Sequence, residues 1–316
     1  MMARVAVVGC GYWGKNLVRN FAELGALAAV VDPVPAVAQA LAETHGVQAR
    51  TLEAVLEDPS ITGVAVAAPA ELHAELAIRA FAAGKHVFVE KPIALTLDDA
   101  EAMKAAGIKA GKSLMVGHLL QYHPAFEALL AAVRAGELGR LRYAYSHRLS
   151  LGKFRVEENV LWSFAPHDVS MLLALFAEEP SGVSGAGGAF VTPGVEDEYR
   201  LNLVFPDGGR AHVFASWLHP FKEHRLVVVG EKAMVVFEDS APSPPDKLRL
   251  YPYEISTSGR APEPKKGDAV ALPFEVDEPL KRECRHFLGV CDGLHAPRTD
   301  ADEAIRVLKV LRHSSP

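Results

Sequence analysis

Cysteine is scarce in this sequence, and long apolar runs are absent from it. The 316 residues include three cysteines, Cys10, Cys284 and Cys291. This odd number, without the spacing of zinc ligands, argues against a disulfide framework and against a metal site. No apolar run reaches the roughly 18 residues that a transmembrane helix needs, so we predict no membrane partner. The chain starts with a predicted strand in place of a signal peptide, and we therefore expect a cytoplasmic protein.

Positive charge is not in excess either. The formal net charge is −6 at pH 7, whereas general nucleic-acid binders are usually basic, so we predict no nucleic-acid partner. Apolar residues make up 49% and charged residues 23% of the chain, which is typical of globular proteins. The length fits one large or two modest domains.

Three glycines interrupt an apolar run near the start of the chain, between a predicted strand over residues 3–8 and a predicted helix over residues 15–24. In a dinucleotide site the first glycine permits a tight turn, the second lets the backbone approach a pyrophosphate, and the third lets the helix pack on the strand. The helix N-terminus then attracts the phosphates. The predicted cofactor contacts in this loop are Gly9, Gly11, Tyr12, Trp13 and Gly14.

An acidic residue, Asp32, follows the next predicted strand. Its distance from the loop is close to the about 20 residues expected for a carboxylate that binds the adenosine ribose. A carboxylate there repels a 2′-phosphate, and the next residue is Pro33, not an arginine that could bind one. We therefore predict NAD as the cofactor, with NADP less favoured.

Predicted strands and helices alternate as far as about residue 120, and the pattern then changes. The first part predicts βαβ units, and hence an α/β protein with an N-terminal Rossmann doubly wound parallel sheet over residues 1–120. Successive strands over residues 184–238 predict a C-terminal α+β domain, residues 121–316, with an open, mostly antiparallel sheet for substrate binding and oligomerisation. The helix over residues 279–290 is a candidate to pack back on the first domain. Residues 240–268 are predicted to be an exposed loop.

Ligands of open parallel sheets bind beyond the carboxyl ends of the strands. Two groups of candidate residues lie there, Pro69 with His73 and Glu90 with Lys91. Pro92 favours an extended conformation at Lys91. A lysine in a partly dry cleft beside a cationic nicotinamide has a lowered pKa and could exchange a proton with a substrate hydroxyl. Taken alone, a lysine after a strand is more often merely exposed.

Residues 9–14, 68–73 and 83–92 resemble the Gfo/Idh/MocA family, named after glucose-fructose oxidoreductase, inositol dehydrogenase and rhizopine catabolism. The run Gly-Lys-His-Val-x-x-Glu-Lys-Pro at residues 84–92 is the most specific of these matches. The resemblance implies a nicotinamide-dependent oxidoreductase that acts on CH–OH groups. It also implies a C-terminal sheet that binds substrate on one face and pairs subunits, as a homodimer or homotetramer, through the other. Lys91 matches the family's catalytic lysine.

The family's second motif is an aspartate followed four residues later by a histidine, on a helix of the substrate domain. Residues 161–170 match it, and His167 aligns with the catalytic histidine, but Ser163 stands in place of the aspartate. A serine cannot act as a carboxylate. Either Lys91 and His167 suffice, or Asp168 or Glu158 supplies the charge.

Histidine, lysine and arginine residues cluster in the second half of the chain, which suits an anionic substrate or else forms a solvated face. Residues 146–153 and 216–223 resemble nucleotide-sugar dehydrogenases of the family, which oxidise the 3-hydroxyl of UDP-N-acetylglucosamine or its uronate. Trp217 is a further candidate to stack on a sugar or base. The predicted substrate-binding residues are His118, Tyr122, Lys153, Arg155, Trp162, Asp168 and His219.

Alternative functions remain open at this point. A dehydrogenase of free polyols or inositols needs no phosphate-binding arginines. A non-catalytic NAD-binding sensor usually lacks the catalytic lysine, whereas Lys91 is present. An NAD-assisted glycosidase is a weaker alternative.

Overall fold

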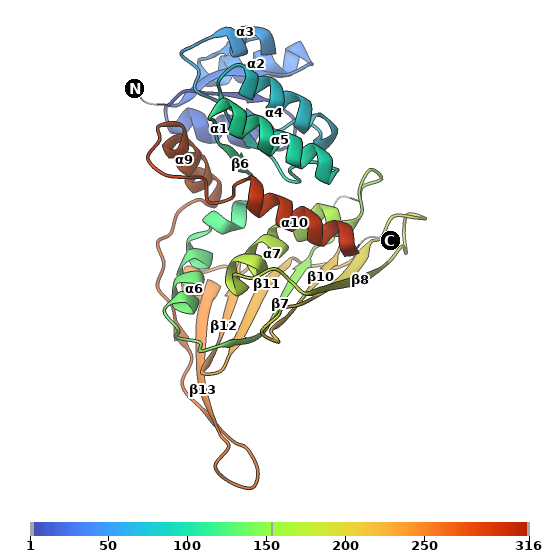
Figure 1. Cartoon of the computed structure of the whole chain (residues 1–316), viewed down its shortest axis with the longest axis vertical. Helices are drawn as coiled ribbons and strands as arrows, with labels where there is room; N and C mark the ends of the chain where they lie inside the picture. The colour runs from blue at the N-terminus through green and yellow to red at the C-terminus, as the bar shows by residue number, and fades with distance from the viewer. Residues whose placement is uncertain (1–2, 153, 315–316) are drawn as a thin grey trace. The chain divides into compact units, whose positions relative to one another are not determined.

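The computed structural model describes residues 3–152 and 154–314. The chain forms two compact units, seen in Figure 1. Unit 1 consists of Met1–Tyr122 and Glu278–Leu308, and unit 2 of His123–Asp277 and Lys309–Pro316.

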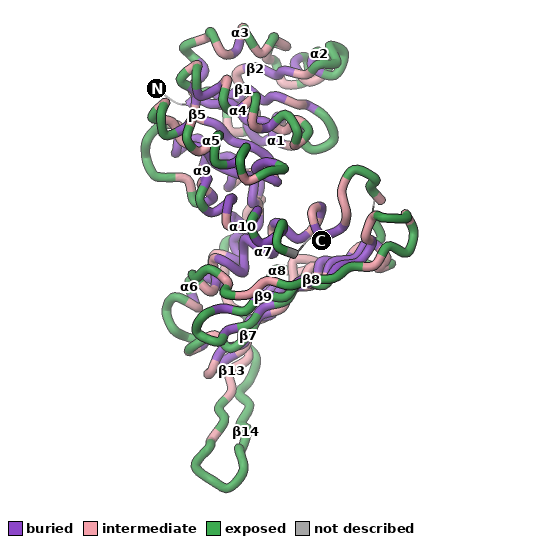
Figure 2. Tube along the Cα trace, turned by 45° about the vertical axis from the view of Figure 1, so that its right-hand side comes forward, coloured by how far each residue is buried: buried purple, intermediate pink, exposed green. Residues whose placement is uncertain are grey.

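Unit 1 is built on a parallel sheet, which has six strands within the described residues, in the order β3-β2-β1-β4-β5-β6. The order reverses between β1 and β4, which is the switch point where ligands of such sheets bind. The central strands are fully buried and appear purple in Figure 2, as expected for a sheet covered on both faces. The predicted Rossmann sheet is therefore confirmed. The strands are β1 (Val5–Val8), β2 (Leu27–Val31), β3 (Gln48–Ala49), β4 (Gly63–Val66), β5 (His86–Val89) and β6 (Leu114–Val116).

The helices of unit 1 start and end at residues that the sequence marks. Thr51 and Thr96 accept hydrogen bonds from backbone N–H groups three residues later, at Ala54 and Asp99, and so cap two helices, as threonine does at N-termini. The helices are α1 (Gly14–Glu23), α2 (Pro35–His45), α3 (Leu52–Glu57), α4 (His73–Ala82), α5 (Leu97–Ala110) and the 3-10 turns η1 (Ala70–Leu72) and η2 (Leu119–Tyr122).

Helix α9 (Pro279–Cys291) contributes to the core of unit 1. Its Phe287 ring packs edge-on against Phe21 and Phe88, with centroid distances of 6.3 and 5.8 Å. A last helix, α10 (Ala301–Ser314), follows and was not predicted from the sequence.

Unit 2 is built on a mixed, mostly antiparallel sheet, as predicted. Its strand order is β14-β13-β12-β11-β7-β10-β9-β8, and β7 and β10 form a parallel pair. Residues 240–268, predicted to be a loop, instead contain α8 (Pro244–Lys247), all of β13 and the β14 strand that pairs with it. The strands are β7 (Leu141–Leu149), β8 (Gly182–Gly188), β9 (Glu198–Val204), β10 (Arg210–Ser216), β11 (Glu223–Gly230), β12 (Ala233–Glu238), β13 (Leu248–Ser256), β14 (Glu263–Lys266) and β15 (Val270–Ala271).

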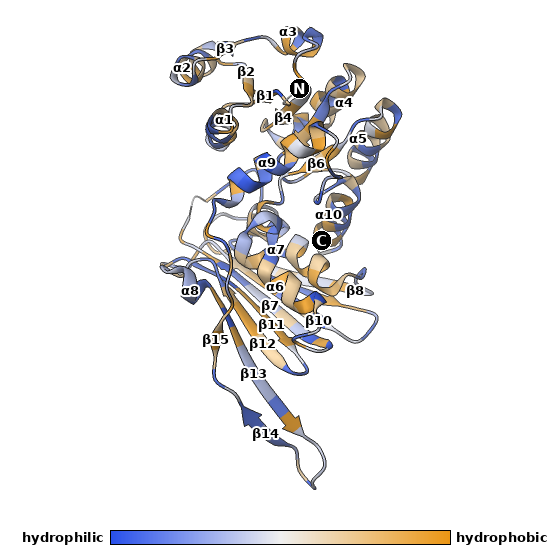
Figure 3. Cartoon of the chain, turned by 90° about the vertical axis from the view of Figure 1, so that its left-hand side faces the viewer, coloured by the Kyte–Doolittle hydropathy of each residue, from blue (hydrophilic) through white to orange (hydrophobic). Residues whose placement is uncertain are grey.

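Helices α6 (Pro124–Arg134) and α7 (Val160–Phe176) cover one face of this sheet, as Figure 3 shows. Successive side chains of β7 point to opposite faces of the sheet, and those of Ala144, Ser146 and Arg148 are buried on the face that the helices cover. The opposite face carries Tyr145 and His147 and is not covered by helices of unit 2 within the described residues. The two faces therefore have different environments on one scaffold.

Candidate functional site

The glycine loop lies between β1 and α1, and two of its glycines are required by the fold itself. Gly9 has φ +90°, and a Cβ on it would lie 2.7 Å from the backbone of Ala67. A Cβ on Gly14 would lie 1.9 Å from the carbonyl oxygen of Gly9. A Cβ on Gly11, in contrast, would meet none of the described atoms within 4 Å. The first and third glycines therefore shape the turn, and the second leaves open space above it.

This open space fits the diphosphate of a dinucleotide. It lies at the start of α1, where the helix dipole and the backbone N–H groups favour an anion. Tyr12 and Trp13 lie beside it and are 86% and 37% exposed. Any side chain on Gly11 would occupy the space over the loop. The residues present thus fit the cofactor that the glycine pattern predicts.

Asp32 forms two hydrogen bonds to the backbone that the sequence did not reveal. Its Oδ2 accepts a hydrogen bond from the backbone N–H of Cys10, at 2.7 Å, and its Oδ1 accepts one from Val34, at 2.9 Å. The carboxylate therefore fixes the glycine loop to the end of β2. Each oxygen of this carboxylate can accept a further hydrogen bond, so both could still accept one from a ribose hydroxyl.

The glycines give a prediction in which stability and cofactor binding separate. Gly14→Ala forces a methyl group against the Gly9 carbonyl, and we expect it to lower the free energy of unfolding by at least about 1–3 kcal/mol and to weaken cofactor binding. Gly11→Ala has room in the fold and is expected to leave the Tm unchanged. We expect it to weaken cofactor binding about tenfold or more, a loss of at least about 1.4 kcal/mol. Thermal unfolding and cofactor titration of both variants measure this, and an equal loss of Tm in both would contradict it.

Glu90 connects the cofactor loop to Lys91. Its Oε1 accepts a hydrogen bond from the indole N–H of Trp13, and its Oε2 accepts one from the backbone N–H of Lys91, at 3.3 Å. The backbone at Gly117 lies against the same carboxyl group, because a Cβ there would come within 3.0 Å of Oε2. Burial raises the pKa of Glu90 to about 7. Three segments of unit 1 therefore meet at one buried carboxyl group, beside the predicted catalytic lysine.

His73 connects the loops after β4 and β5. Its Nδ1 lies 2.9 Å from the carbonyl oxygen of Pro92, and its Nε2 lies 2.9 Å from that of Ala68. The side chain is 1% exposed, and burial lowers its pKa. Pro69 lies in the same loop and immediately precedes η1. This geometry favours a role for His73 in shaping the loops over a direct contact with the cofactor.

His118 and Tyr122 lie inside unit 1, with exposures of 2% and 1%. The Nδ1 atom of His118 lies 2.6 Å from the carboxylate of Glu303, and the Tyr122 hydroxyl lies 2.9 Å from that of Thr299. Both were predicted to bind substrate. Their burial and partners favour bracing the segment after β6 against residues 299–303 instead.

In unit 2 the strand register gathers three loops at one end of the sheet. Leu149 of β7 pairs with Ser216 of β10 and with Glu223 of β11, while Glu198 of β9 pairs with Ser216 and with Gly188 of β8. The described residues of segments 150–158, 189–197 and 217–222 therefore leave the sheet together. The N-terminal end of α7 joins them, because Val160 N–H donates to the carbonyl of Glu196 at 3.0 Å.

Several predicted substrate residues belong to this end of unit 2. Arg155 is exposed and forms an ion pair with Glu158 at 2.9 Å. The Nδ1 of His219 lies 2.8 Å from the carbonyl oxygen of Phe221. Trp162, on the first turn of α7, is partly exposed. Lys153 lies outside the described residues.

Helix α7 presents Asp168 and His167 to different surroundings. Asp168 is fully buried, and Arg148 donates to both of its oxygens, from Nε at 3.0 Å and from Nη2 at 3.1 Å. The Ser146 hydroxyl also donates to it. His167 is partly exposed. Neighbouring residues of a helix point about 100° apart, so His167 and Asp168 face different surroundings. The geometry therefore favours Asp168 as the anchor of α7 on the sheet, and not as a contact for substrate.

Trp217 is also internal. It is fully buried, with Phe154 and Phe164 packed edge-on at centroid distances of 6.0 and 6.4 Å. Trp217 therefore offers no exposed ring face for a ligand, whereas Trp162 is partly exposed.

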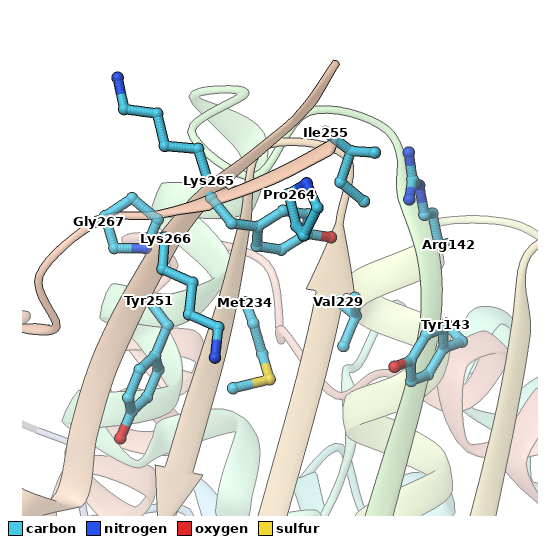
Figure 4. A pocket seen from close by; sticks show the side chains of 12 residues that line it. Arg142, Tyr143, Val229, Met234, Tyr251, Ile255, Pro264, Lys265, Lys266 and Gly267 are labelled. Atoms are coloured by element: carbon cyan, nitrogen blue, oxygen red, sulfur yellow. The ribbon is translucent and has the colours of Figure 1, made fainter. Parts of the chain in front are cut away.

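A separate cavity of about 550 Å³ lies in unit 2, at the edge of the sheet where β14 pairs with β13 (Figure 4). Four of its lining residues, Tyr143, Val229, Met234 and Tyr251, are paired across neighbouring strands and stand in one row. They share the uncovered face with Tyr145. None of the predicted substrate residues within the described ranges lines this cavity.

Two classes of site or segment are not found among residues 3–152 and 154–314. No group of three or more histidine, cysteine, aspartate and glutamate side chains is placed to hold a metal ion. No helix in these ranges has both the length and the apolar character needed to cross a membrane.

Comparisons with known proteins cover both units. Residues 3–118 match the model of the oxidoreductase family with an NAD-binding Rossmann fold, and residues 126–236 match the Gfo/Idh/MocA C-terminal domain. UDP-N-acetylglucosamine 3-dehydrogenase of Acidithiobacillus ferrooxidans is 29% identical over 305 residues, 93% of each chain. The scyllo-inositol 2-dehydrogenase of Bacillus subtilis is 29% identical over 250 residues, 73% of this chain and 72% of that one.

A solved structure agrees with these matches. A putative oxidoreductase from Magnetospirillum magnetotacticum has 31% identity and a TM-score of 0.85, over 100% of both chains. Two family models and a full-length structural relative thus agree with the resemblance seen in residues 9–14, 68–73 and 83–92. The chain belongs to the Gfo/Idh/MocA family of oxidoreductases.

Proposed function

We propose that the protein is an NAD-dependent dehydrogenase that oxidises a ring hydroxyl of a nucleotide sugar, the 3-hydroxyl of a UDP-N-acetylhexosamine or its uronate. The observation that carries the chemistry is the link from Trp13 through Glu90 to Lys91, which ties the lysine to the cofactor loop within one unit. The substrate class is supported by the UDP-N-acetylglucosamine 3-dehydrogenase, because its similarity extends over 93% of both chains.

The choice of NAD rests on Asp32. Its carboxylate is held at the end of β2 by the backbone N–H groups of Cys10 and Val34. A fixed negative charge at this position accepts hydrogen bonds from the ribose hydroxyls and repels a 2′-phosphate. Pro33 offers no positive charge to offset that repulsion.

In the proposed reaction the substrate hydroxyl loses its proton to Lys91 or His167, the carbon-bound hydrogen leaves as hydride, and a ketone results. The nicotinamide ring, when bound, supplies the hydride acceptor. The neutral amine of Lys91 or the neutral imidazole of His167 takes the proton as general base. The role of His167 rests on its match to the family histidine. The loop segments 150–158 and 217–222, with Arg155 and His219, would bind the anionic part of the substrate.

A dehydrogenase of free polyols or inositols is the second candidate. It is favoured by the 29% identity to scyllo-inositol 2-dehydrogenase. It is also favoured by the pairing of Arg148 with Asp168, which removes one arginine from those available to a phosphate. A non-catalytic sensor is disfavoured because Lys91 is retained.

We also propose that copies of the chain associate through the uncovered face of the unit 2 sheet. The row of Tyr143, Val229, Met234 and Tyr251 beside the cavity supports this, because apolar and aromatic side chains are common at interfaces between copies. Light scattering of the purified protein measures its mass, and a monomer would contradict the proposal.

A substrate panel tests the proposed function. The purified protein is incubated with NAD or NADP and with UDP-N-acetylglucosamine, its uronate, or inositols, and the absorbance of the reduced cofactor is followed. We expect reduction of NAD by a UDP-sugar and little reduction of NADP. Oxidation of inositol without oxidation of any UDP-sugar would support the second candidate, and cofactor binding without any turnover would support a sensor.

A further inference from the structure

Helix α9 of unit 1 buries an acidic residue that has no evident partner. Glu283 is 1% exposed. Neither Oε1 nor Oε2 forms a hydrogen bond with any of the described residues. Glutamate is almost never fully buried unless it is paired, so this side chain needs an explanation.

Among the described residues, no positive charge acts on Glu283 to offset its burial, and the Arg298 guanidinium lies over the ring of the neighbouring Tyr122 instead, 4.8 Å from its centroid. The titratable neighbours of Glu283 are Glu90, which follows β5, Tyr122 of η2, and Cys284, the next residue of α9. Of these, the Glu90 carboxylate is the charge that acts on Glu283. Phe287 and the rest of the α9 core residues are apolar.

The two buried acids differ in how their charged forms are stabilised. Glu90 accepts hydrogen bonds from the Trp13 indole and the Lys91 backbone, and the charges of Lys91 and His118 also favour its ionised form. Glu283 has no such donors among the described residues. An unpaired carboxylate in the protein interior is far less stable than the protonated acid, and a second negative charge close by increases the difference.

We propose that Glu283 is a positioning residue of the active site that remains protonated, so that the pair of Glu90 and Glu283 carries one negative charge beside Lys91. The proposal rests on the proposed function in one respect, the assignment of Lys91 as proton acceptor. Two negative charges at this place would stabilise the ammonium form of Lys91 and make it a weaker base. A neutral Glu283 prevents this.

The pKa directions agree with this assignment. Burial raises the pKa of Glu283 well above its usual range, and the negative charge of Glu90 raises it further. Burial raises the pKa of Glu90 only to about 7, because the Trp13 hydrogen bond and the Lys91 charge act against it. Glu90 therefore ionises first and Glu283 keeps the proton.

Infrared spectroscopy tests the protonation without any need for activity. The full-length protein is measured about one unit above the pKa of Glu90, where that group is mostly ionised. We expect the carbonyl-stretch band of a protonated carboxylic acid in the wild type and its loss in Glu283→Gln. Glu278→Gln is the matched control on α9, because Glu278 pairs with Arg19 and its pKa is lowered; this variant should keep the band. A band that is equally strong in the wild type and in Glu283→Gln would overturn the proposal.

Thermal unfolding as a function of pH gives a second readout. A glutamate whose pKa is raised on folding loses its proton first in the unfolded chain. Stability therefore falls as pH rises between the two pKa values, tenfold in the unfolding equilibrium per pH unit. Glu283→Gln cannot ionise, so its Tm should exceed that of the wild type by a margin that grows with pH. Glu278→Gln should instead lower the Tm, and this loss should fade as pH falls.

Two outcomes would contradict the neutral state directly. A Tm that falls in Glu283→Gln by the same amount at every pH would indicate a hydrogen-bonding role unrelated to charge. Failure of this variant to fold would also overturn the proposal, because an amide replaces a neutral acid at nearly equal volume.

The pH profile of kcat/KM connects the pair to turnover. If Glu283 is neutral, Glu283→Gln removes no charge. An acidic limb of the kcat/KM profile that is due to Glu90 should then lie at the same pH in this variant as in the wild type. If Glu283 were ionised, its removal would move that limb to lower pH by about one unit or more. The infrared and unfolding results stand even if no substrate is found, so a failure of the proposed function remains distinguishable from a failure of this inference.

Discussion

Lys91→Ala is expected to abolish turnover, by about 10²–10⁴-fold or more, while the nicotinamide cofactor still binds. A positioned general base contributes about this factor. The contacts predicted to hold the cofactor come mainly from the glycine loop and Asp32. The hydrogen bonds that hold Asp32 in place come from the backbone of Cys10 and Val34, and not from the Lys91 side chain. Steady-state kinetics on the substrate identified by the panel, together with cofactor titration, measure the two effects separately.

Lys109→Ala is the matched control for this prediction. Lys109 is exposed in the last turn of α5 of the same unit, so its removal should change neither turnover nor binding. Full activity in Lys91→Ala would refute the assignment of Lys91. Loss of cofactor binding in Lys91→Ala would show that the lysine also holds the cofactor. His167→Ala then tests whether the remaining activity depends on the second proton acceptor.

The Rossmann sheet was predictable from the sequence because its signals are local. Each buried strand is a short apolar run, and turns such as the one at Gly9 need a conformation that glycine adopts easily. The family motifs at residues 84–92 belong to the same regular part of the chain. Hydrogen bonds between residues far apart in the sequence leave no local pattern that could predict them. The bond from the Cys10 N–H to the Asp32 carboxylate is an example.

The clusters of positive charge were harder to interpret. A sequence shows that Arg148 and Asp168 are polar, but not that they satisfy each other inside the unit. The partners of His118 and Tyr122, at residues 303 and 299, could not be read from the sequence for the same reason, since they lie far along the chain. A buried polar side chain forms hydrogen bonds inside the protein and is less available to a ligand. Which polar residues are buried depends on tertiary packing, which the sequence does not show directly.

The segment 240–268 shows the opposite error. Its proline, serine and lysine content is typical of a loop, yet β13 and β14 form a hairpin there. The exposure of β14, green in Figure 2, explains the composition, because a strand with both faces in solvent has no alternation of apolar and polar residues.

Asp168→Ala is expected to lower the free energy of unfolding by about 3–5 kcal/mol, which is typical when one partner of a buried ion pair is removed. The change leaves Arg148, which is 8% exposed, without the carboxylate that accepts both of its hydrogen bonds, and it removes the acceptor of the Ser146 hydroxyl. His224, at 3.0 Å from the Arg148 guanidinium, cannot replace the lost charge. Chemical denaturation of the variant and the wild type measures the difference.

The control and the double variant decide whether the pair is structural. Asp246→Ala removes an exposed carboxylate that lies 3.4 Å from Arg249 in the same unit, and surface pairs of this kind contribute about 0–1 kcal/mol. The double variant Arg148→Met/Asp168→Leu should recover much of the loss, because apolar side chains of similar size replace a buried pair with little net cost. Unchanged stability in Asp168→Ala, together with a raised KM for the substrate, would instead return Asp168 to the substrate site.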